Sequence, residues 1–281
     1  MAGLLSGLSE IGLGGLENME VYEQPEDKEA EKQAEEKPEV KEETFLFDKS
    51  YECPVCYQGF KAKTVRSGKL RSLGTDRDLR PLYDQMEPLK YDVVICPHCG
   101  YAALTRFFGG LTAGQIKAIK ESISANFHPV KEEKEIYTYE EALYRYKLCL
   151  ANTIVKHGKV SEKAYICLKA GWLLRSMGEN LDPAVEDYNK KMQEIKEQEK
   201  DFLKNALDGL ITARQTESYP ICGMDEVTLE YLIAVLAMEF EKYDISSRLI
   251  YNILNTPTVN NRIKDKAREV KDELLQQMGK K

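Results

Sequence analysis

The apolar residues of the chain follow two patterns, and the change between them comes near residue 110. From residue 45 to about 108 they form short runs between turn residues, and the clearest run covers residues 91–95. Such runs predict strands. Residues 61–65 and 69–73 flank Ser67 and Gly68, which predicts a hairpin turn there. From about residue 112 the apolar residues recur every three or four positions, which predicts helices.

Start and stop signals divide this second part into seven helices. Thr138 with Glu141 forms a capping box, Pro183 follows Asp182 as at a first helical position, and Asp225 is a further N-cap candidate. Short connections between helices favour antiparallel hairpins in a stack. The predicted helices cover residues 112–127, 138–157, 161–178, 183–216, 225–242, 244–257 and 260 or 261 to the end.

The first 44 residues have neither pattern. Residues 23–44 are rich in Glu, Lys and Pro with almost nothing to bury, which predicts a disordered acidic linker. Residues 1–22 place Leu4, Leu8 and Ile11 on one helical face, but five glycines oppose a stable helix. This apolar head is therefore either a disordered terminus or a short docking peptide that orders on a partner or on the body of the protein.

Charge and composition add little to the prediction of function. The net charge is -7, yet residues 1–44 alone hold thirteen acidic and four basic residues, so the remainder is close to neutral. The overall acidity is therefore a poor guide to partners. No apolar run approaches about twenty residues, so no membrane span is expected. Residues 1–16 lack a basic start and contain Glu10, which argues against a secretory signal.

Cysteine spacing is the strongest chemical signal. Two Cys-Pro-x-Cys pairs are separated by thirty-nine residues, and the second is followed by Gly100. Two residues between cysteines let one tight turn direct both sulfurs at one ion, and four thiolates form a tetrahedron that zinc accepts. We expect a closed, structural zinc site whose Cys96→Ser variant unfolds or aggregates the first unit. The expected ligands are Cys53, Cys56, Cys96 and Cys99.

Two other interpretations of the cysteines stay open. The same ligand set could hold iron in a rubredoxin-like electron-transfer site, and a redox dithiol is a weaker alternative because no βαβ pattern surrounds the pairs. The count of seven cysteines, with two close pairs, does not fit a secreted disulfide framework. A reduced compartment, and so the cytoplasm, is the expected location. His98 lies between two cysteines and is expected to face solvent.

The segment between the two pairs is basic over residues 61–80, which provides a second functional hypothesis. Zinc ribbons can contact nucleic acid, and this segment could do so, although no alternating aromatics provide a stacking platform. A solvated hairpin face, or a docking site for the acidic linker, is the favoured explanation of this charge. The residues concerned are Lys61, Lys63, Arg66, Lys69 and Arg71.

The sequence of the predicted helical part is similar to tetratricopeptide repeats. Ala142, Tyr146 and Cys149 occupy positions where such repeats need small or aromatic residues, and Ala234 and Ser246 do so later. The thirty-four-residue period is not kept, so the resemblance is to the hairpin and not to a regular array. Stacks of this kind present a groove to a protein partner. Three aromatic residues could line such a groove, but a core position is favoured for them: Tyr144, Trp172 and Tyr251.

Taken together, these motifs resemble an uncharacterised bacterial family of unknown function that has paired zinc knuckles followed by tetratricopeptide-like helices. The stretches that carry the resemblance are the two cysteine pairs and residues 79–83 and 96–102. It implies an α+β fold: a small zinc-ribbon or rubredoxin-like β unit, then a mainly helical stack. The expected division is 1–44 head and linker, 45–108 zinc-knuckle β domain and 109–281 helical domain.

No catalytic constellation is found: the chain has no phosphate-binding loop, no nucleophile elbow and no zinc-protease helix. His128 and His157 have the pattern of helix C-terminal residues, and Cys149 and Cys167 that of buried apolar residues. Cys222 lies in a loop and is the one to test for reactivity. The first hypothesis is therefore a non-enzymatic zinc-binding adaptor or scaffold with an unidentified protein partner. The alternatives are a nucleic-acid-binding zinc ribbon and an iron electron-transfer protein.

Overall fold

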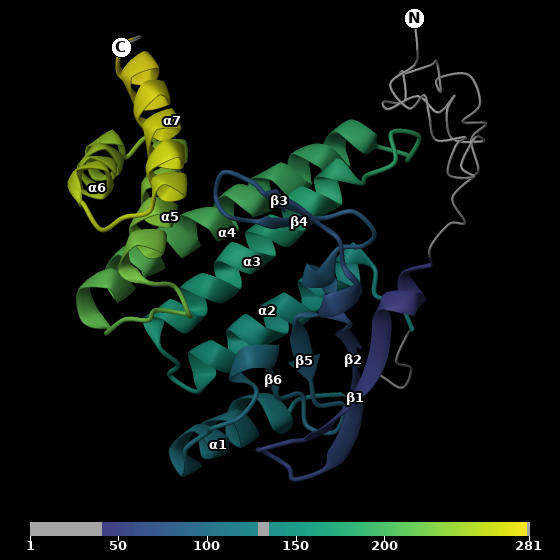
Figure 1. Ribbon diagram of the computed structural model, residues 1–281. Coiled ribbons are helices and arrows are strands. Elements are labelled where there is room, and N and C mark those ends of the chain that lie inside the picture. The colour runs from purple at the N-terminus through teal and green to yellow at the C-terminus, as the bar shows by residue number, and fades with distance from the viewer. Residues whose placement is uncertain (1–40, 129–134, 280–281) are drawn as a thin grey trace, which may run out of the picture. The chain divides into compact units, whose positions relative to one another are not determined.

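The computed structural model describes residues 41–128 and 135–279 (Figure 1). These residues belong to one compact unit, which begins at Lys41. The apolar head and most of the acidic linker lie outside the described residues, so both remain predictions. The last three linker positions differ from expectation, because Glu42–Phe45 forms a turn of 3-10 helix. The Glu42 carboxylate accepts hydrogen bonds from Lys90 Nζ (2.8 Å) and from the Tyr91 hydroxyl (2.7 Å), which fixes this end of the linker.

Three two-stranded antiparallel sheets make up the β part. The first pairs β1 (Leu46–Glu52) with β2 (Gly59–Val65), the second β3 (Ser72–Thr75) with β4 (Pro81–Tyr83), and the third β5 (Val93–Ile95) with β6 (Ala102–Leu104). The first and third sheets are hairpins whose turns are the two cysteine pairs. Each pair of cysteines therefore sits at the tip of its own hairpin.

The predicted hairpin around Ser67 and Gly68 is wrong. β2 pairs back with β1 across the first cysteine pair, and residues 67–69 form a 3-10 turn that leads to β3. The β1–β2 pairing wins because its register places Tyr51 opposite Phe60, and the two rings stack with their centroids 5.7 Å apart.

Seven α-helices follow in the described residues: α1 (Ala113–Ile119), α2 (Tyr139–Val155), α3 (Val160–Glu179), α4 (Tyr188–Thr216), α5 (Glu226–Glu239), α6 (Tyr243–Asn255) and α7 (Asn261–Met278). The expected caps are present: the Thr138 hydroxyl accepts from Glu141 N–H in a capping box, and the Asp225 and Asn260 side chains each accept from the third helical residue. The prediction of an α+β fold with a small β part and a larger helical part is confirmed.

One helix begins later than the sequence predicted. Asp182 and Pro183 were expected to start α4, but the Asp182 carboxylate accepts from Ala184 N–H in a local turn. Asp187 then adopts a left-handed conformation (φ 58°), and the helix begins at Tyr188. A side chain that satisfies a nearby backbone N–H competes with the helix for that donor, which explains the delay.

Helices α2, α3 and α4 run side by side (Figure 1), and α3 and α4 approach most closely at two glycines. A Cβ at Gly171 would lie 2.6 Å from Leu203 Cδ2, and one at Gly209 would lie 2.7 Å from Ala164 Cβ. The order of these contacts shows that the two helices are antiparallel. Glycine at these two positions therefore lets α3 and α4 pack closely.

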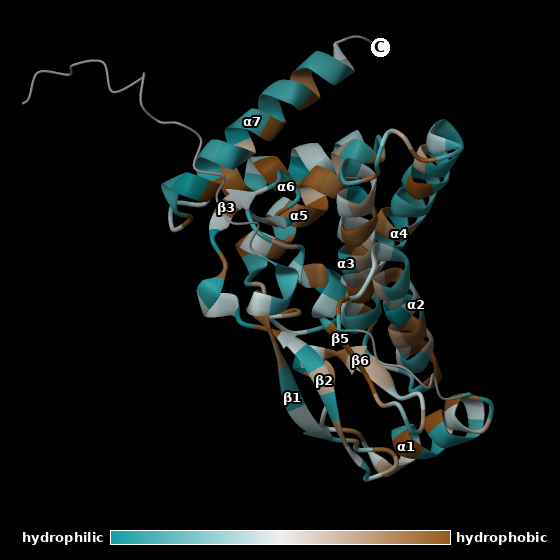
Figure 2. Ribbon diagram, turned by 90° about the vertical axis from the view of Figure 1, so that its right-hand side faces the viewer, coloured by the Kyte–Doolittle hydropathy of each residue, from teal (hydrophilic) through white to brown (hydrophobic). Residues whose placement is uncertain are grey.

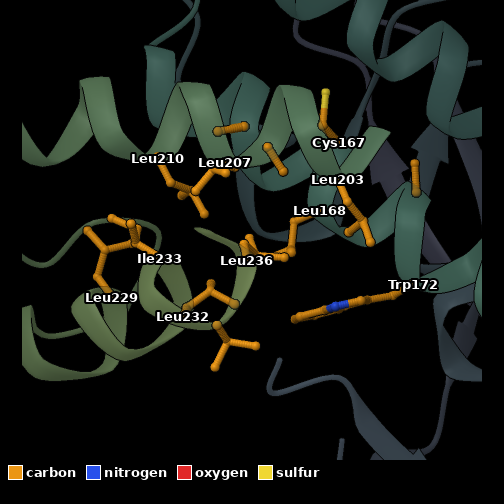
Figure 3. Close-up of a cluster of buried hydrophobic side chains, with 14 of the residues drawn as sticks. Cys167, Leu168, Trp172, Leu203, Leu207, Leu210, Leu229, Leu232, Ile233 and Leu236 are labelled. Atoms are coloured by element: carbon orange, nitrogen blue, oxygen red, sulfur yellow. The ribbon is translucent and has the colours of Figure 1, made fainter. Parts of the chain in front are cut away.

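The helical core fills the space between α3, α4 and α5. Figure 3 shows Leu168 and Trp172 of α3 facing leucines of α4 and α5. Helix α5 is buried from Leu229 to Met238, whereas α7 is mostly hydrophilic (Figure 2). The expectation of a core position is confirmed for Trp172 and wrong for Tyr144 and Tyr251, which are 54% and 68% exposed. Both tyrosines lie on the solvent side of their amphipathic helices.

The β5–β6 hairpin contributes residues to two hydrophobic clusters. Val93, Ala102 and Leu104 pack in the helical core, whereas Val94 and Ala103 pack in a second cluster that contains Cys53, Cys96 and Cys99. Alternate residues of a strand point to opposite faces, so β5 and β6 can belong to both clusters at once. This shared hairpin carries the cysteine cluster next to the helices.

Candidate metal centre

The four cysteines of the two pairs meet at one point. Their sulfur atoms all lie within 4.8 Å of one another; Cys53 Sγ is 3.6 Å from Cys99 Sγ, and Cys56 Sγ is 3.5 Å from Cys96 Sγ. All four are free thiols. Four sulfurs placed about 2.3 Å from one tetrahedral ion lie roughly 3.8 Å apart. The arrangement therefore fits a single metal ion held by four thiolates.

The two turns are built in the same way and are called here the first knuckle (residues 53–58) and the second knuckle (residues 96–101). In each, the N–H of the first cysteine donates to the carbonyl five residues later, and the residue four positions on donates back to that cysteine's carbonyl. The bonds are Cys53 N to Gln58 O (3.1 Å), Tyr57 N to Cys53 O (2.9 Å), Cys96 N to Tyr101 O (2.8 Å) and Gly100 N to Cys96 O (3.0 Å).

Both knuckles require a left-handed residue at the same place. It is Gly100 in the second knuckle (φ 73°) and Tyr57 in the first (φ 60°). Glycine adopts this conformation without a steric penalty, whereas a side chain with a Cβ is disfavoured there. The departure from the glycine pattern in the first knuckle is thus a real backbone cost.

Backbone amides direct positive charge at the sulfurs. Val55 N–H points at Cys53 Sγ (3.4 Å), and the Cys56 N–H also donates to it. The His98 and Cys99 amides do the same for Cys96. These donors favour the thiolate form. Hydrogen bonds from Cys96 and Cys99 lower the pKa of Cys53, and hydrogen bonds to Cys53 and Cys96 raise the pKa of Cys99, so these three thiols are coupled.

The cluster is closed to solvent on most sides. Cys53 and Cys96 are fully buried, Cys99 is 7% exposed and Cys56 is half-buried. Phe60, Tyr101 and Phe108 pack around them, with ring centroids 5.1 to 5.8 Å apart. Four protein sulfurs leave no coordination position for water in a tetrahedral site. Such closure is typical of a structural metal site and not of a catalytic one.

The other candidate residues lie apart from this centre. His98 and His128 are exposed, and His157 lies in the turn after α2 in a left-handed conformation (φ 52°). Cys149 and Cys167 are buried, and burial raises the pKa of both thiols, that of Cys167 to about 11.

Cys222 does not have the surroundings of a reactive cysteine. Its thiol is half-buried, donates to Ser161 O (3.3 Å), and has its pKa raised to about 11 by burial. A thiol with a raised pKa holds little thiolate at neutral pH and is a poor nucleophile.

The five basic residues predicted to contact nucleic acid or the linker differ in their surroundings. Lys63 of β2 pairs with Asp48 (3.0 Å), and the Arg66 guanidinium donates to Leu46 O (3.2 Å). Arg71 lies 3.8 Å from Asp84 and is mostly exposed. Lys61 and Lys69 are exposed. Part of the positive charge of the segment is therefore balanced by neighbouring acceptors.

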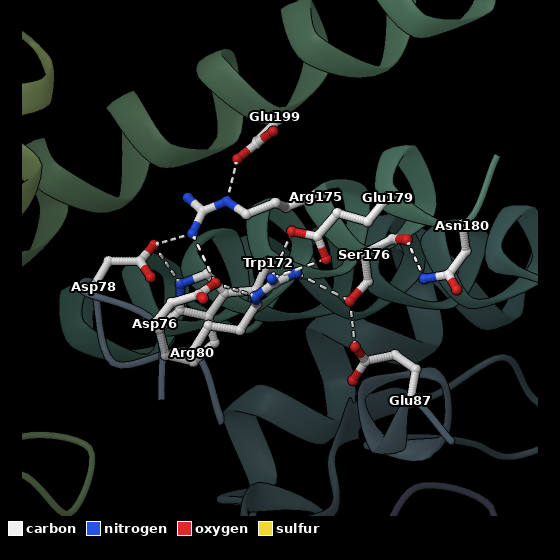
Figure 4. A network of polar contacts seen from close by, with 10 residues as sticks. All are labelled: Asp76, Asp78, Arg80, Glu87, Trp172, Arg175, Ser176, Glu179, Asn180 and Glu199. Atoms are coloured by element: carbon white, nitrogen blue, oxygen red, sulfur yellow. Dashed lines mark hydrogen bonds and ion pairs between the residues drawn. The ribbon is translucent and has the colours of Figure 1, made fainter. Parts of the chain in front are cut away.

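A buried ionic network, which sequence reasoning missed, ties the β3–β4 turn to α3 (Figure 4). Arg80 is 2% exposed and donates to Asp76 (2.5 Å), to Ser176 Oγ (3.1 Å) and to both oxygens of Glu179 (2.7 and 2.9 Å). Its charge is thus fully paired. In the sequence, residues 79–83 stand out only as a motif, and nothing in them indicates that Arg80 contacts α3.

Asp78 anchors the other end of the same network. Its carboxylate accepts from Trp172 Nε1 (2.8 Å) and pairs with Arg175 (2.9 Å), which in turn pairs with Glu199 of α4 (2.7 Å). The network joins the β part to two helices, and its two innermost charges, Arg80 and Asp78, are almost fully buried. Breaking one partner of such a group is strongly destabilising because the other charge is left buried.

The comparisons with known proteins identify a family and no nearer relative. No curated protein and no solved structure matches the chain. Within the described residues, no helix is long and apolar enough to cross a membrane. Residues 46–274 match the family described as "Uncharacterized protein conserved in bacteria (DUF2225)", a range that holds both knuckles and all but the last residues of α7. The chain therefore belongs to this conserved bacterial family.

Proposed function

We propose that the protein is a non-enzymatic, zinc-stabilised adaptor whose helical part binds a protein partner. The observation that carries the proposal is the closed cluster of Cys53, Cys56, Cys96 and Cys99, whose own apolar cluster shares the β5–β6 hairpin with the helical core. A closed four-sulfur site supplies folding free energy and leaves no position for a substrate. In this proposal the four-cysteine site stabilises the fold, and the surface of the helical part binds the partner.

Zinc is the metal that we propose, because tetrahedral four-thiolate sites with backbone N–H donors suit it. Iron suits the same ligands. The test is metal analysis of the protein purified without added metal, together with its visible spectrum. One zinc per chain and no colour supports the proposal. A red protein with one iron per chain contradicts it and favours a rubredoxin-like electron-transfer protein.

The helical part offers exposed aromatic and aliphatic side chains of the kind found at protein interfaces. Tyr144, Ile154 and Tyr251 are 53 to 68% exposed on α2 and α6. Tyrosine is enriched at binding hot spots. In addition, the apolar head on its acidic linker would add a second contact away from the body.

A tagged pull-down of the full chain from native cells, with and without nuclease, tests the adaptor. Specific proteins that persist after nuclease, and that are lost with Tyr144→Ala or Tyr251→Ala, support it. Because both tyrosines are exposed, these variants keep the fold intact. Bound material that disappears with nuclease favours instead the nucleic-acid hypothesis. In that case neutral substitutions at Lys61 and Lys69, the exposed lysines of the basic segment, should weaken binding and reduce its salt dependence.

A further inference from the structure

The two knuckles are supported in different ways, and the difference concerns helix α2. Three side chains of α2 donate to backbone carbonyls of the second knuckle and of the segment that precedes it. The bonds are Tyr146 Oη to Leu89 O (3.1 Å), Arg145 Nη2 to Val93 O (3.3 Å) and Asn152 Nδ2 to Gly100 O (3.1 Å). Arg145 and Asn152 are seven residues apart, two helical turns, so they face the same way. They hold the chain just before Cys96 and just after Cys99.

Asn152 is placed to fix the knuckle itself. It is fully buried, and its amide also donates to Leu148 O (2.9 Å) in its own helix, which fixes its orientation. Its acceptor, Gly100, is the left-handed residue that lets the turn close behind Cys99. A Cβ at Gly100 would lie 2.5 Å from the Phe127 ring, so the turn is also confined from the other side.

The first knuckle is supported differently. Apolar packing of Val55 and Phe60 holds its hairpin, and Lys120 Nζ lies 5.9 Å from the exposed Tyr57 ring. Its left-handed residue carries a side chain and is therefore strained. Its second cysteine, Cys56, is the most exposed of the four. The strain at Tyr57 and the exposure of Cys56 make its ligating form less stable than that of the second knuckle.

We propose that α2 holds the second knuckle in its ligating form before metal arrives, so that Cys96 and Cys99 are a preorganised half-site, and that the first knuckle closes on the ion afterwards. Asn152 is the positioning residue of this half-site. The inference rests on the proposed zinc site and adds the order in which it forms. It follows that the β1–β2 hairpin is the part of the fold whose order depends on metal, while α2 and the β5–β6 hairpin keep their packing without it.

The variant Asn152→Ala tests the role of α2 in the full-length chain. We expect zinc affinity, measured by competition with a chromophoric chelator, to fall 10- to 100-fold, as for other groups that orient metal ligands. Ser246→Ala is the matched control. Ser246 is fully buried and donates to Ala234 O (2.7 Å), so this substitution removes a comparable hydrogen bond, between α5 and α6 and away from the metal site. Its zinc affinity should stay within about threefold of the wild type. Equal losses in both variants would mean general destabilisation and overturn the inference.

Hydrogen exchange of the wild-type chain after chelation tests the same point without a substitution, and so covers the case in which Asn152→Ala fails to fold. We expect α2 and residues 93–104 to keep their protection while residues 46–65 lose theirs. Loss of both regions together, or of residues 93–104 first, contradicts the proposed order. A wild-type chain that binds no zinc overturns the metal proposal and the inference together, whereas zinc binding that is indifferent to Asn152 overturns the inference alone.

Discussion

The first and second knuckles have the same Cys-Pro-x-Cys sequence and the same turn hydrogen bonds, yet their surroundings differ. The second has glycine at the left-handed position and is held by α2. The first has Tyr57 at that position, two-thirds exposed, at the tip of a hairpin. Two identical ligand motifs can therefore form halves of a metal site that the surrounding structure holds to different degrees. The cost of ordering a ligand pair depends on what already holds its backbone.

Removal of a metal ligand should have the largest effect, because it abolishes the site that both knuckles share. We expect Cys99→Ser to lose bound metal and to be destabilised by several kcal/mol, since structural zinc binding contributes about 10 kcal/mol or more in small metal-dependent folds. Metal content and thermal unfolding measure this. The control is Cys222→Ser, whose hydroxyl can still donate to Ser161 O and which should keep both metal and stability. A metal-free Cys99→Ser protein that unfolds at the wild-type temperature would remove the structural role.

Gly100→Ala should have the next largest effect and tests the glycine of the second knuckle. The added methyl meets Phe127 at 2.5 Å and is placed at φ 73°. Left-handed strain costs about 1–2 kcal/mol and overpacking about 1–3 kcal/mol, so we expect a loss of roughly 2–4 kcal/mol in chemical denaturation. Gly68→Ala serves as the reference, since nothing lies within 4 Å of its added Cβ and its φ is not left-handed. Equal stability of the two variants would contradict this role of Gly100.

Tyr57→Gly should change stability in the opposite direction. Removing the side chain relieves the left-handed strain, which we expect to stabilise the metal-bound protein by about 1 kcal/mol. The gain is small because glycine also increases the entropy of the unfolded chain. Tyr57→Phe separates the backbone from the hydroxyl and should leave stability unchanged. A Tyr57→Gly protein that is less stable than the wild type would show that the ring, and not the backbone, decides this position.

Lys120→Ala should have the smallest effect. The ammonium lies 5.9 Å from the Tyr57 ring, and an exposed contact of this type contributes about 0.5 kcal/mol. Lys120→Ala should cause the same loss in a Tyr57→Phe background as in the wild type, since phenylalanine keeps the ring face that the ammonium contacts. A loss above about 1 kcal/mol would mean that the first knuckle is held as firmly as the second, and the contrast between them would disappear.

Local signals in the sequence determined a large part of the structure. The caps at Thr138, Asp225 and Asn260 mark helix starts because their side chains bind the nearest free N–H groups. Each cysteine pair forms its knuckle because the turn is set by backbone hydrogen bonds within six residues. The prediction failed at Asp182, where another local turn competes with the helix. It failed also at Ser67, where strand pairing depends on what packs beneath it.

Tertiary structure decided everything that joins distant segments. The bonds of Asn152 to Gly100 and of Arg80 to Glu179 connect residues 52 and 99 positions apart, and no periodicity or motif indicates them. Exposed Tyr251 and buried Trp172 likewise could not be told apart by residue type. The sequence alone therefore determined the helices, the caps and the four-thiol motif, because these depend on neighbours within a few residues. Which knuckle is braced, and by which helix, depends on packing between elements, and only the folded chain decides it.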